Sequence, residues 1–143
     1  MEREEDYGRC INQLSHQIKR RVNAHLAGMG ITGVQGRVLH YIIGHCNEAA
    51  VFQKDIEEAF GLRRSTATGI LQLLEKNDLI RRETVAYDAR LKSLVPTEKA
   101  AGIHEEMRAC IRETELLLTR NIDPEQLELF LKIIRMMSEN LES

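Results

Sequence analysis

Residues 63–72 combine small polar and basic side chains that could form hydrogen bonds with nucleic acid. On the outer face of a helix, such side chains reach the donors and acceptors at base edges in the DNA major groove. Arginine can bind guanine and glutamine can bind adenine through two hydrogen bonds, and hydroxyl groups can contact bases or phosphates. The predicted DNA-contacting residues here are Arg63, Arg64, Ser65, Thr66, Thr68 and Gln72, with Arg63, Arg64 and Thr66 placed to read bases. A solvated helix face has a similar composition, so this segment alone leaves both interpretations open.

A second polar and basic segment spans residues 86–92 and includes Arg90 and Lys92. At a loop tip, these two side chains could reach the minor groove or, as we expect for Lys92, a phosphate. Asp88 would be repelled by phosphate, so we expect it to stabilise this loop by pairing with Arg90, Arg81 or Arg82. For Asp88 taken alone, a plain charged turn is the alternative.

Two helices and a hairpin must position these residues. Residues 53–60 predict a short helix, Gly61 follows where a left-handed residue would end it, and residues 63–77 resume helical periodicity. Two helices joined by a short turn that contains glycine form a candidate helix-turn-helix. Residues 79–85 and 93–97 are typical of two strands, so residues 86–92 would be the tip of a hairpin, or wing.

Amphipathic helices flank this module. Apolar residues recur every three or four positions along residues 7–26, and a further helix begins after Thr32, whose side chain can cap it. Thr97 is expected to cap a long helix, and Asp123-Pro124 predicts the last helix with the aspartate as its cap. The predicted fold class is mainly α with a small β-hairpin wing: a winged helix-turn-helix with N- and C-terminal dimerisation helices.

The apolar stripes at the two ends of the chain exceed what one small module can bury. They include Ile11, Leu14, Met107, Ile111, Ile133 and Met137. Symmetric dimers are the commonest way to cover such surfaces. We predict a single domain over residues 1–143, in which residues 33–99 form the winged helix-turn-helix and residues 1–32 and 100–143 form the interface of a homodimer.

The chain of 143 residues is 43% hydrophobic, enough for one compact core. Its net charge is −2, but residues 61–99 carry eight basic and five acidic residues. Because a net charge does not show where basic residues lie, this modestly basic middle is compatible with a DNA-binding module.

The expected location follows from the start of the chain and from the cysteines. Residues 1–6 are charged, unlike a secretory signal or a mitochondrial presequence, and no apolar run is long enough to span a membrane. Cys10, Cys46 and Cys110 are widely spaced and lack a C-x-x-C pair, unlike a disulfide or zinc framework. We expect a cytoplasmic protein without a membrane partner.

Four stretches, in this order and spacing, resemble the MarR family of bacterial regulators over nearly the whole chain. Residues 53–56 (QKDI) are similar to that family's Q-x-x-L helix, and residues 73–82 (LLEKNDLIRR) to L-E-x-x-G-L-I-x-R. Residues 88–90 (DAR) resemble the D-x-R of the wing, and residues 95–100 (VPTEKA) resemble v-x-L-T-x-x-G. The resemblance implies a two-fold dimer that binds a palindrome in double-stranded DNA, with repression as the family's usual mode.

The chain departs from the family pattern at five positions. Asp78 and Ala100 stand where glycine is common, Pro96 replaces a usual leucine, and Tyr87 replaces a frequent proline. Gly69 lies where many relatives carry a longer polar or basic residue. None of these changes removes a DNA-contacting group, so they bear on the operator sequence and the affinity.

In MarR-like proteins a ligand, an oxidised cysteine or a metal commonly loosens DNA binding. Cys10 lies in the first helix, where some MarR-like redox sensors keep their cysteine; it is the candidate redox sensor, with a small buried hydrophobe as the alternative. The five histidines lack the i, i+4 spacing that builds a metal site on one helix face, so we predict no metal or other cofactor. A small-molecule effector in an apolar pocket beside the winged module is implied by resemblance alone.

Enzyme motifs are missing from the sequence: it has no nucleophile elbow, phosphate-binding loop or H-E-x-x-H. We therefore expect no enzyme. The alternative to a DNA-binding regulator is a winged-helix module that binds another protein without specific DNA binding. The two hypotheses differ in whether Arg90 supports salt-sensitive DNA binding.

Overall fold

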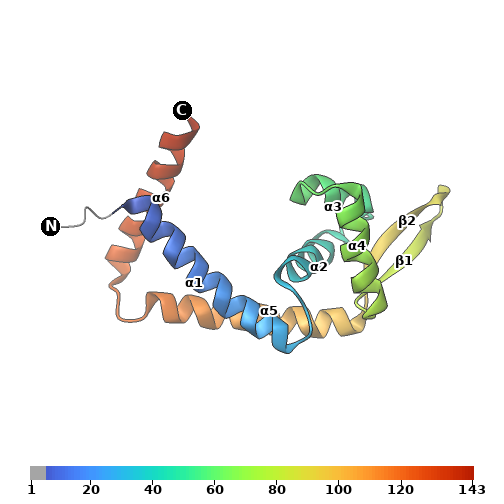
Figure 1. Cartoon of the computed structure of the whole chain (residues 1–143), viewed down its shortest axis with the longest axis horizontal. Helices are drawn as coiled ribbons and strands as arrows, with labels where there is room; N and C mark the ends of the chain where they lie inside the picture. Colours follow the sequence, from blue (N-terminus) through green and yellow to red (C-terminus); the bar gives the residue numbers. More distant parts are fainter. Residues whose placement is uncertain (1–5) are drawn as a thin grey trace.

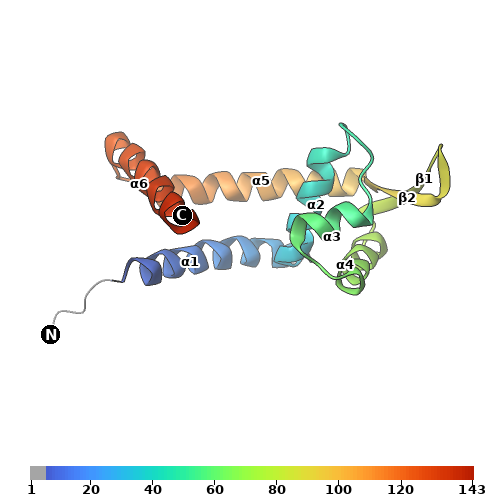
Figure 2. The same ribbon diagram turned by 90° about the horizontal axis from the view of Figure 1, so that it is seen from above.

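The computed structural model describes residues 6–143, so the predictions made from the charged residues 1–5 lie outside it. The elements are α1 (Tyr7–Gly28), α2 (Gly33–His45), α3 (Gln53–Phe60), α4 (Arg64–Lys76), β1 (Ile80–Val85), β2 (Asp88–Pro96), α5 (Glu98–Thr119) and α6 (Pro124–Glu142). The long helices α1 and α5 lie side by side (Figure 2). At one end of them lie α2, α3, α4 and the hairpin, and α6 lies at the other (Figure 1). These helices and the two-stranded hairpin match the predicted fold class.

Threonine side chains cap the N-termini of two helices, as predicted. At α2, Gln35 N donates to Thr32 Oγ1 at 3.2 Å and Thr32 N donates back to Gln35 Oε1 at 3.1 Å, which is a capping box. At α5, Thr97 Oγ1 accepts from the backbone N–H of Ala100 at 3.2 Å. Asp123 occupies the N-cap position of α6 as predicted, but its side chain makes no capping hydrogen bond. Helix α6 instead starts with a proline, whose ring fixes φ near the helical value.

The end of α4 and the start of α5 are joined by three hydrogen bonds, which we call the Thr97 junction. Thr97 Oγ1 donates to the carbonyl oxygen of Asp78 at 2.6 Å, and Thr97 N donates to the carbonyl oxygen of Leu79 at 3.1 Å. Lys99 Nζ donates to the carbonyl oxygen of Asn77 at 2.8 Å. Asp78 has a φ of +58°, a left-handed conformation that aspartate tolerates better than most residues. The junction therefore fixes the chain just after α4 to the first turn of α5.

The strands of the wing are longer than predicted, and the loop between them is shorter. Strands β1 and β2 pair antiparallel until Val85 and Asp88, where the chain turns. The predicted tip of residues 86–92 is therefore too long, because β2 already begins at Asp88. Most of these polar side chains are exposed and show no apolar alternation, so their sequence resembled a loop. Consequently Arg90 and Lys92 lie on a strand.

The hydrophobic core lies in the part formed by α2, α3, α4, β1 and β2, which we call the winged unit. Its largest fully buried side chains are Val38, Leu39, Ile42, Ile56, Leu71, Leu74, Leu79, Ile80 and Leu94. We call α1, α5 and α6 the helical arm. In the arm, α6 has no buried residue and α1 buries Leu26 alone. Within residues 6–143, none of the helices combines the length and the apolar character needed to cross a membrane.

Candidate nucleic-acid interface

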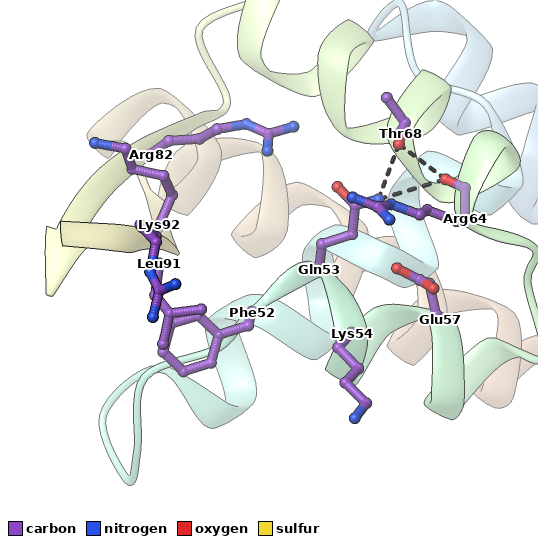
Figure 3. A pocket seen from close by; sticks show the side chains of 10 residues that line it. Phe52, Gln53, Lys54, Glu57, Arg64, Thr68, Arg82, Leu91 and Lys92 are labelled. Atoms are coloured by element: carbon purple, nitrogen blue, oxygen red, sulfur yellow. Dashed lines mark hydrogen bonds between the residues drawn. The ribbon is translucent and has the colours of Figure 1, made fainter. Parts of the chain in front are cut away.

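Several of the predicted DNA-contacting residues gather where α3, α4 and the hairpin meet. These elements line a hollow of about 490 Å³, which we call the cationic groove (Figure 3). Its cations are Lys54 from α3, Arg64 from α4, Arg82 from β1, and Arg90 and Lys92 from β2. Glu57 is the carboxylate among the lining residues. This excess of positive charge would attract a phosphate backbone.

The first turn of α4 presents two arginines to solvent. The chain turns out of α3 at Gly61, whose φ of +61° is left-handed. Glycine suits this position because a side chain would strain a left-handed backbone. Arg63 begins α4 without a side-chain capping bond, and Arg63, Arg64, Ser65 and Thr66 are all exposed. Backbone N–H groups at a helix N-terminus, together with the helix dipole, favour a phosphate. This turn can therefore bind a phosphate as well as base edges.

Gln53 and Thr68 connect α3 to α4 at the floor of the groove. Gln53 Nε2 donates to Thr68 Oγ1 at 2.8 Å, and the Thr68 hydroxyl donates to the carbonyl oxygen of Arg64 at 2.8 Å (Figure 3). Both side chains are partly buried. The Thr68 hydroxyl is thus engaged within the protein, and contact between Thr68 and DNA stays a prediction.

Asp88 is held by Arg90, one of its three expected partners. The Asp88 Oδ1 atom accepts from the backbone N–H of Arg90 at 2.9 Å and from its Nε at 3.3 Å. These hydrogen bonds lower the pKa of Asp88 below its ordinary value of 3.8, because they stabilise the carboxylate. The Arg90 side chain is 91% exposed. It can therefore still reach a phosphate while its backbone is fixed by Asp88.

Arg82 and Lys92 lie on adjacent strands and are each positioned by one neighbour. Arg82 Nε donates to Glu75 Oε2 of α4 at 2.8 Å, and Lys92 Nζ donates to Thr84 Oγ1 across the hairpin at 2.6 Å. Arg82 also borders a second hollow, of about 580 Å³, which Gln72 lines from α4. The two hollows adjoin and form one surface along α4, because Thr68 and Arg82 line both.

Sequence reasoning missed three cations of this surface: Lys54, Lys76 and Arg82. Lys54 stood inside the Q-x-x-L stretch, and Lys76 and Arg82 stood inside the stretch similar to L-E-x-x-G-L-I-x-R, so both motifs were usable signals. The only role assigned to the Arg82 side chain was that of a possible partner for Asp88. The candidate redox residue, Cys10, is exposed in the first turn of α1. Helix α1 begins at the opposite end of the molecule from α4 (Figure 1). In the described part of the chain, no three histidine, cysteine, aspartate or glutamate side chains gather as metal ligands.

A separate pocket of about 530 Å³ lies between α1, α2 and α5, and we call it the α1–α2–α5 pocket. Its wall is largely apolar and includes Val22, Leu26, Phe60, Met107 and Ile111. A histidine pair also lines it: His40 Nδ1 lies 2.9 Å from His104 Nε2, and the two rings stack with centroids 5.1 Å apart. The sequence did not reveal this pair, because 64 positions separate the two residues.

Comparisons with known proteins bear on the family and the fold of this chain. A family model described as the MarR family matches residues 29–91, which include α2, α3, α4 and most of the hairpin. MepR, described as a transcription regulator of the Staphylococcus aureus multidrug efflux pump MepA, is a similar solved structure with 26% sequence identity. Its TM-score is 0.85, and the match covers 96% of this chain and 99% of that chain.

Two further structures are similar over nearly the whole chain. The S. aureus MepR–DNA complex has a TM-score of 0.75 at 26% identity, with 95% of this chain and 96% of that chain covered. A putative MarR family transcriptional regulator from Clostridium acetobutylicum has a TM-score of 0.76 at 27% identity, with 94% and 97% covered. These matches extend beyond the winged unit into the helical arm.

Proposed function

Since this chain belongs to the MarR family, we propose that it regulates transcription by binding double-stranded DNA as a homodimer. The observation that carries the proposal is the cationic groove, where cations from two helices and both strands of the hairpin converge although the whole chain has a net charge of −2. In the proposed complex, α4 enters the major groove and the hairpin reaches the adjacent backbone or minor groove. MepR, a similar chain, has been solved in complex with DNA, which supports DNA binding by similarity.

The proposed contacts follow from where each side chain lies. The exposed first turn of α4 gives Arg63, Arg64 and Thr66 access to base edges and Ser65 access to a phosphate. Gln72, exposed further along α4, reads a neighbouring base pair. Lys92 contacts phosphate and Arg90 contacts the minor groove or its backbone, with Asp88 fixing the strand beneath them.

The homodimer is proposed because the helical arm leaves apolar side chains uncovered. In α6, Leu129 is 56% exposed and Phe130 is 50% exposed. A second copy of the arm, related by two-fold symmetry, would bury these side chains. The same symmetry would place the two winged units on the half-sites of a palindromic operator.

Regulation is proposed to act on this dimer. We propose that the protein is a cytoplasmic repressor without catalytic activity, released by a small molecule in the α1–α2–α5 pocket. That pocket contacts α2 of the winged unit as well as α1 and α5 of the arm, so an occupant can favour one arrangement of the two parts. Oxidation of Cys10, which is exposed on α1, is the second proposed route of release.

The decisive experiment is selection of bound sequences from a random duplex pool, repeated at two salt concentrations. Recovery of an inverted repeat with half-sites about one helical turn apart would support the proposal. Weak binding without an enriched motif, lost at moderate salt, would favour the alternative of a winged-helix module that binds another protein.

Variants of neighbouring arginines make the test specific to the groove. Successive residues of a strand point to opposite faces, so Arg81 is a matched control for Arg82, which lines the groove. We expect Arg64→Ala to weaken specific binding by about 1–3 kcal/mol and to relax the preference at one base pair. Arg82→Ala and Arg90→Ala should reduce affinity and its salt dependence, whereas Arg81→Ala should change both much less. Equal losses from Arg81→Ala and Arg82→Ala would contradict the assigned groove.

A further inference from the structure

Two carboxylates lie among the cations that line the proposed DNA-binding surface. Glu57 of α3 lines the cationic groove, and Glu75 of α4 lines the adjoining hollow. Phosphate repels a carboxylate, so each of these side chains lowers the affinity for DNA that the neighbouring cations provide. A carboxylate on such a surface therefore needs a compensating role, and the contacts of Glu75 indicate one.

Glu75 lies on the same stripe of α4 as polar side chains proposed to face DNA. Thr68, Gln72 and Glu75 follow one another at steps of four and three residues, which places them on one face of the helix. All three line the same hollow, and the Glu75 side chain is 48% exposed. The carboxylate is therefore part of the surface that would meet a bound duplex.

The Glu75 carboxylate holds the Arg82 guanidinium through one nitrogen. Arg82 Nε donates to Glu75 Oε2 at 2.8 Å, so the side chain extends from β1 toward α4 (Figure 3). A hydrogen bond through Nε leaves the four N–H groups of Nη1 and Nη2 for another partner. Because Arg82 also lines the cationic groove, these groups lie at the surface where a phosphate would bind.

The backbone end of the Arg82 side chain is fixed by the hairpin. Ile80 and Arg82 lie two residues apart on β1 and therefore share one face of the strand. Ile80 is fully buried in the core, and the Arg82 side chain is 29% exposed. Arg82 thus starts at the edge of the core and ends at Glu75. A side chain held at both ends loses little rotamer freedom when it binds a phosphate, so the contact is pre-organised.

We propose that Glu75 is a positioning residue that increases the sequence specificity of DNA binding: it orients Arg82 for one phosphate, and its charge opposes binding wherever that phosphate is missing. A duplex bound in the correct register places a phosphate at Nη1 and Nη2 and gains the oriented contact. A duplex bound in any other register meets the carboxylate without this gain. The inference deepens the proposed function and rests on it, because it concerns the same surface.

The test compares the affinities of full-length variants for two duplexes of equal length, the selected operator and an unrelated sequence. Glu75→Gln removes the charge but keeps an oxygen that can accept from Arg82 Nε. We expect it to bind the unrelated duplex about threefold more tightly than the unmodified chain does, with a salt dependence steeper by up to about one released ion. Binding to the operator should change little, because the weaker hold on Arg82 offsets the removed repulsion. The ratio of the two affinities should therefore fall by about threefold.

Two further variants separate positioning from charge. Glu57→Gln makes the same charge change on the same surface while the hydrogen bond to Arg82 stays in place, so it should strengthen binding to both duplexes alike. Glu83→Gln is the control outside the groove, because Glu83 forms a long, exposed pair with Arg81 at 3.8 Å, and it should change both affinities much less. A ratio that is unchanged in Glu75→Gln, or that falls equally in Glu57→Gln, would overturn the positioning role.

The orientation of Arg82 is measured without DNA, by the exchange of arginine Nε–H protons in nuclear magnetic resonance spectra. In the unmodified chain, the Nε–H of Arg82 should exchange with water several times more slowly than that of Arg81, whereas in Glu75→Ala the two rates should be similar. Similar rates in the unmodified chain would overturn the proposed hold on Arg82. Thermal unfolding checks that each variant is folded.

The selection experiment separates this inference from the function on which it rests. A chain that selects no DNA sequence would overturn the proposed function, and the inference with it. A chain that selects an operator but keeps the same affinity ratio in Glu75→Gln would overturn the inference alone.

Discussion

The winged unit and the helical arm use their apolar residues in opposite ways. In the winged unit, helices and hairpin enclose a common core, and side chains such as Leu39, Ile56 and Leu71 are fully buried within one chain. In the arm, α6 buries nothing, and Phe130 is half exposed. The difference indicates that the winged unit owes its stability to its own packing, whereas the arm needs a second surface.

The largest expected effect comes from truncating side chains in the two regions. Leu39→Ala, in the core of the winged unit, should lower the free energy of unfolding by about 2–5 kcal/mol because it leaves a cavity. Leu129→Ala, at an exposed position of α6, should have a much smaller effect at low protein concentration. Denaturant unfolding at several protein concentrations measures both. A concentration-independent loss of equal size in the two variants would show that α6 is stabilised within one chain.

A charge placed in the arm should separate the subunits while leaving the winged unit folded. We expect Phe130→Asp to weaken the proposed dimer by about 2 kcal/mol or more, since it buries a carboxylate in an apolar interface. Sedimentation equilibrium measures the dissociation constant, and Lys132→Asp on the same helix is the control for added negative charge. If Phe130→Asp stays as dimeric as the unmodified chain, the apolar face of α6 is not the interface.

A smaller effect is expected from loosening the contact that positions α4. Gln53→Ala removes the hydrogen bond to Thr68, and we expect it to reduce DNA affinity by about 0.5–1.5 kcal/mol through the orientation of α4. Quantitative DNA binding and circular dichroism of the same samples distinguish this from unfolding. Lys54→Ala, beside it, should instead reduce the salt dependence of binding. An unchanged affinity in Gln53→Ala would assign Gln53 no positioning role.

The smallest expected effect is the pH dependence of stability at the boundary between the two regions. The pKa of His104 is lower in the folded chain than its ordinary 6.5, so the unfolded chain binds more protons in this range. Stability should therefore be unaffected by His104 above pH 6.5, fall as the pH drops through 6.5, and level off below the folded pKa. Unfolding curves across this range should be flatter for His104→Gln. A steeper dependence in that variant would reverse the assigned sign.

Local chemistry explains which parts of this molecule the sequence predicts. Thr32 and Thr97 cap helices, and Gly61 adopts a left-handed conformation, because these preferences depend on a few neighbouring residues. The start of β2 at Asp88 was missed because a polar strand is defined by its partner β1 and not by its own pattern. The helices predicted from the spacing of apolar residues were correct. That spacing does not show which apolar faces are buried within one chain.

The candidate site shows the same division. The exposed position of the arginines and hydroxyl residues at the start of α4 could be predicted from the sequence, whereas their contact with DNA stays a prediction. The engagement of Thr68 by Gln53, and that of Arg82 by Glu75, could not, because each contact depends on how two elements pack. The His40–His104 pair is the extreme case, with its partners on α2 and α5.

The Thr97 junction joins α4 and α5, so that the two helices can turn together about this point. At 1.5 Å per residue, the 22 residues of α5 extend roughly 33 Å from the junction, and the 13 residues of α4 extend roughly 20 Å from it. A rotation of about 5° about this pivot moves the far end of α5 by about 3 Å and the start of α4 by about 2 Å. In the proposed dimer, the helical arms hold the two subunits together. The distance between the two copies of α4 is therefore set far from the DNA, by the angle at which the subunits meet.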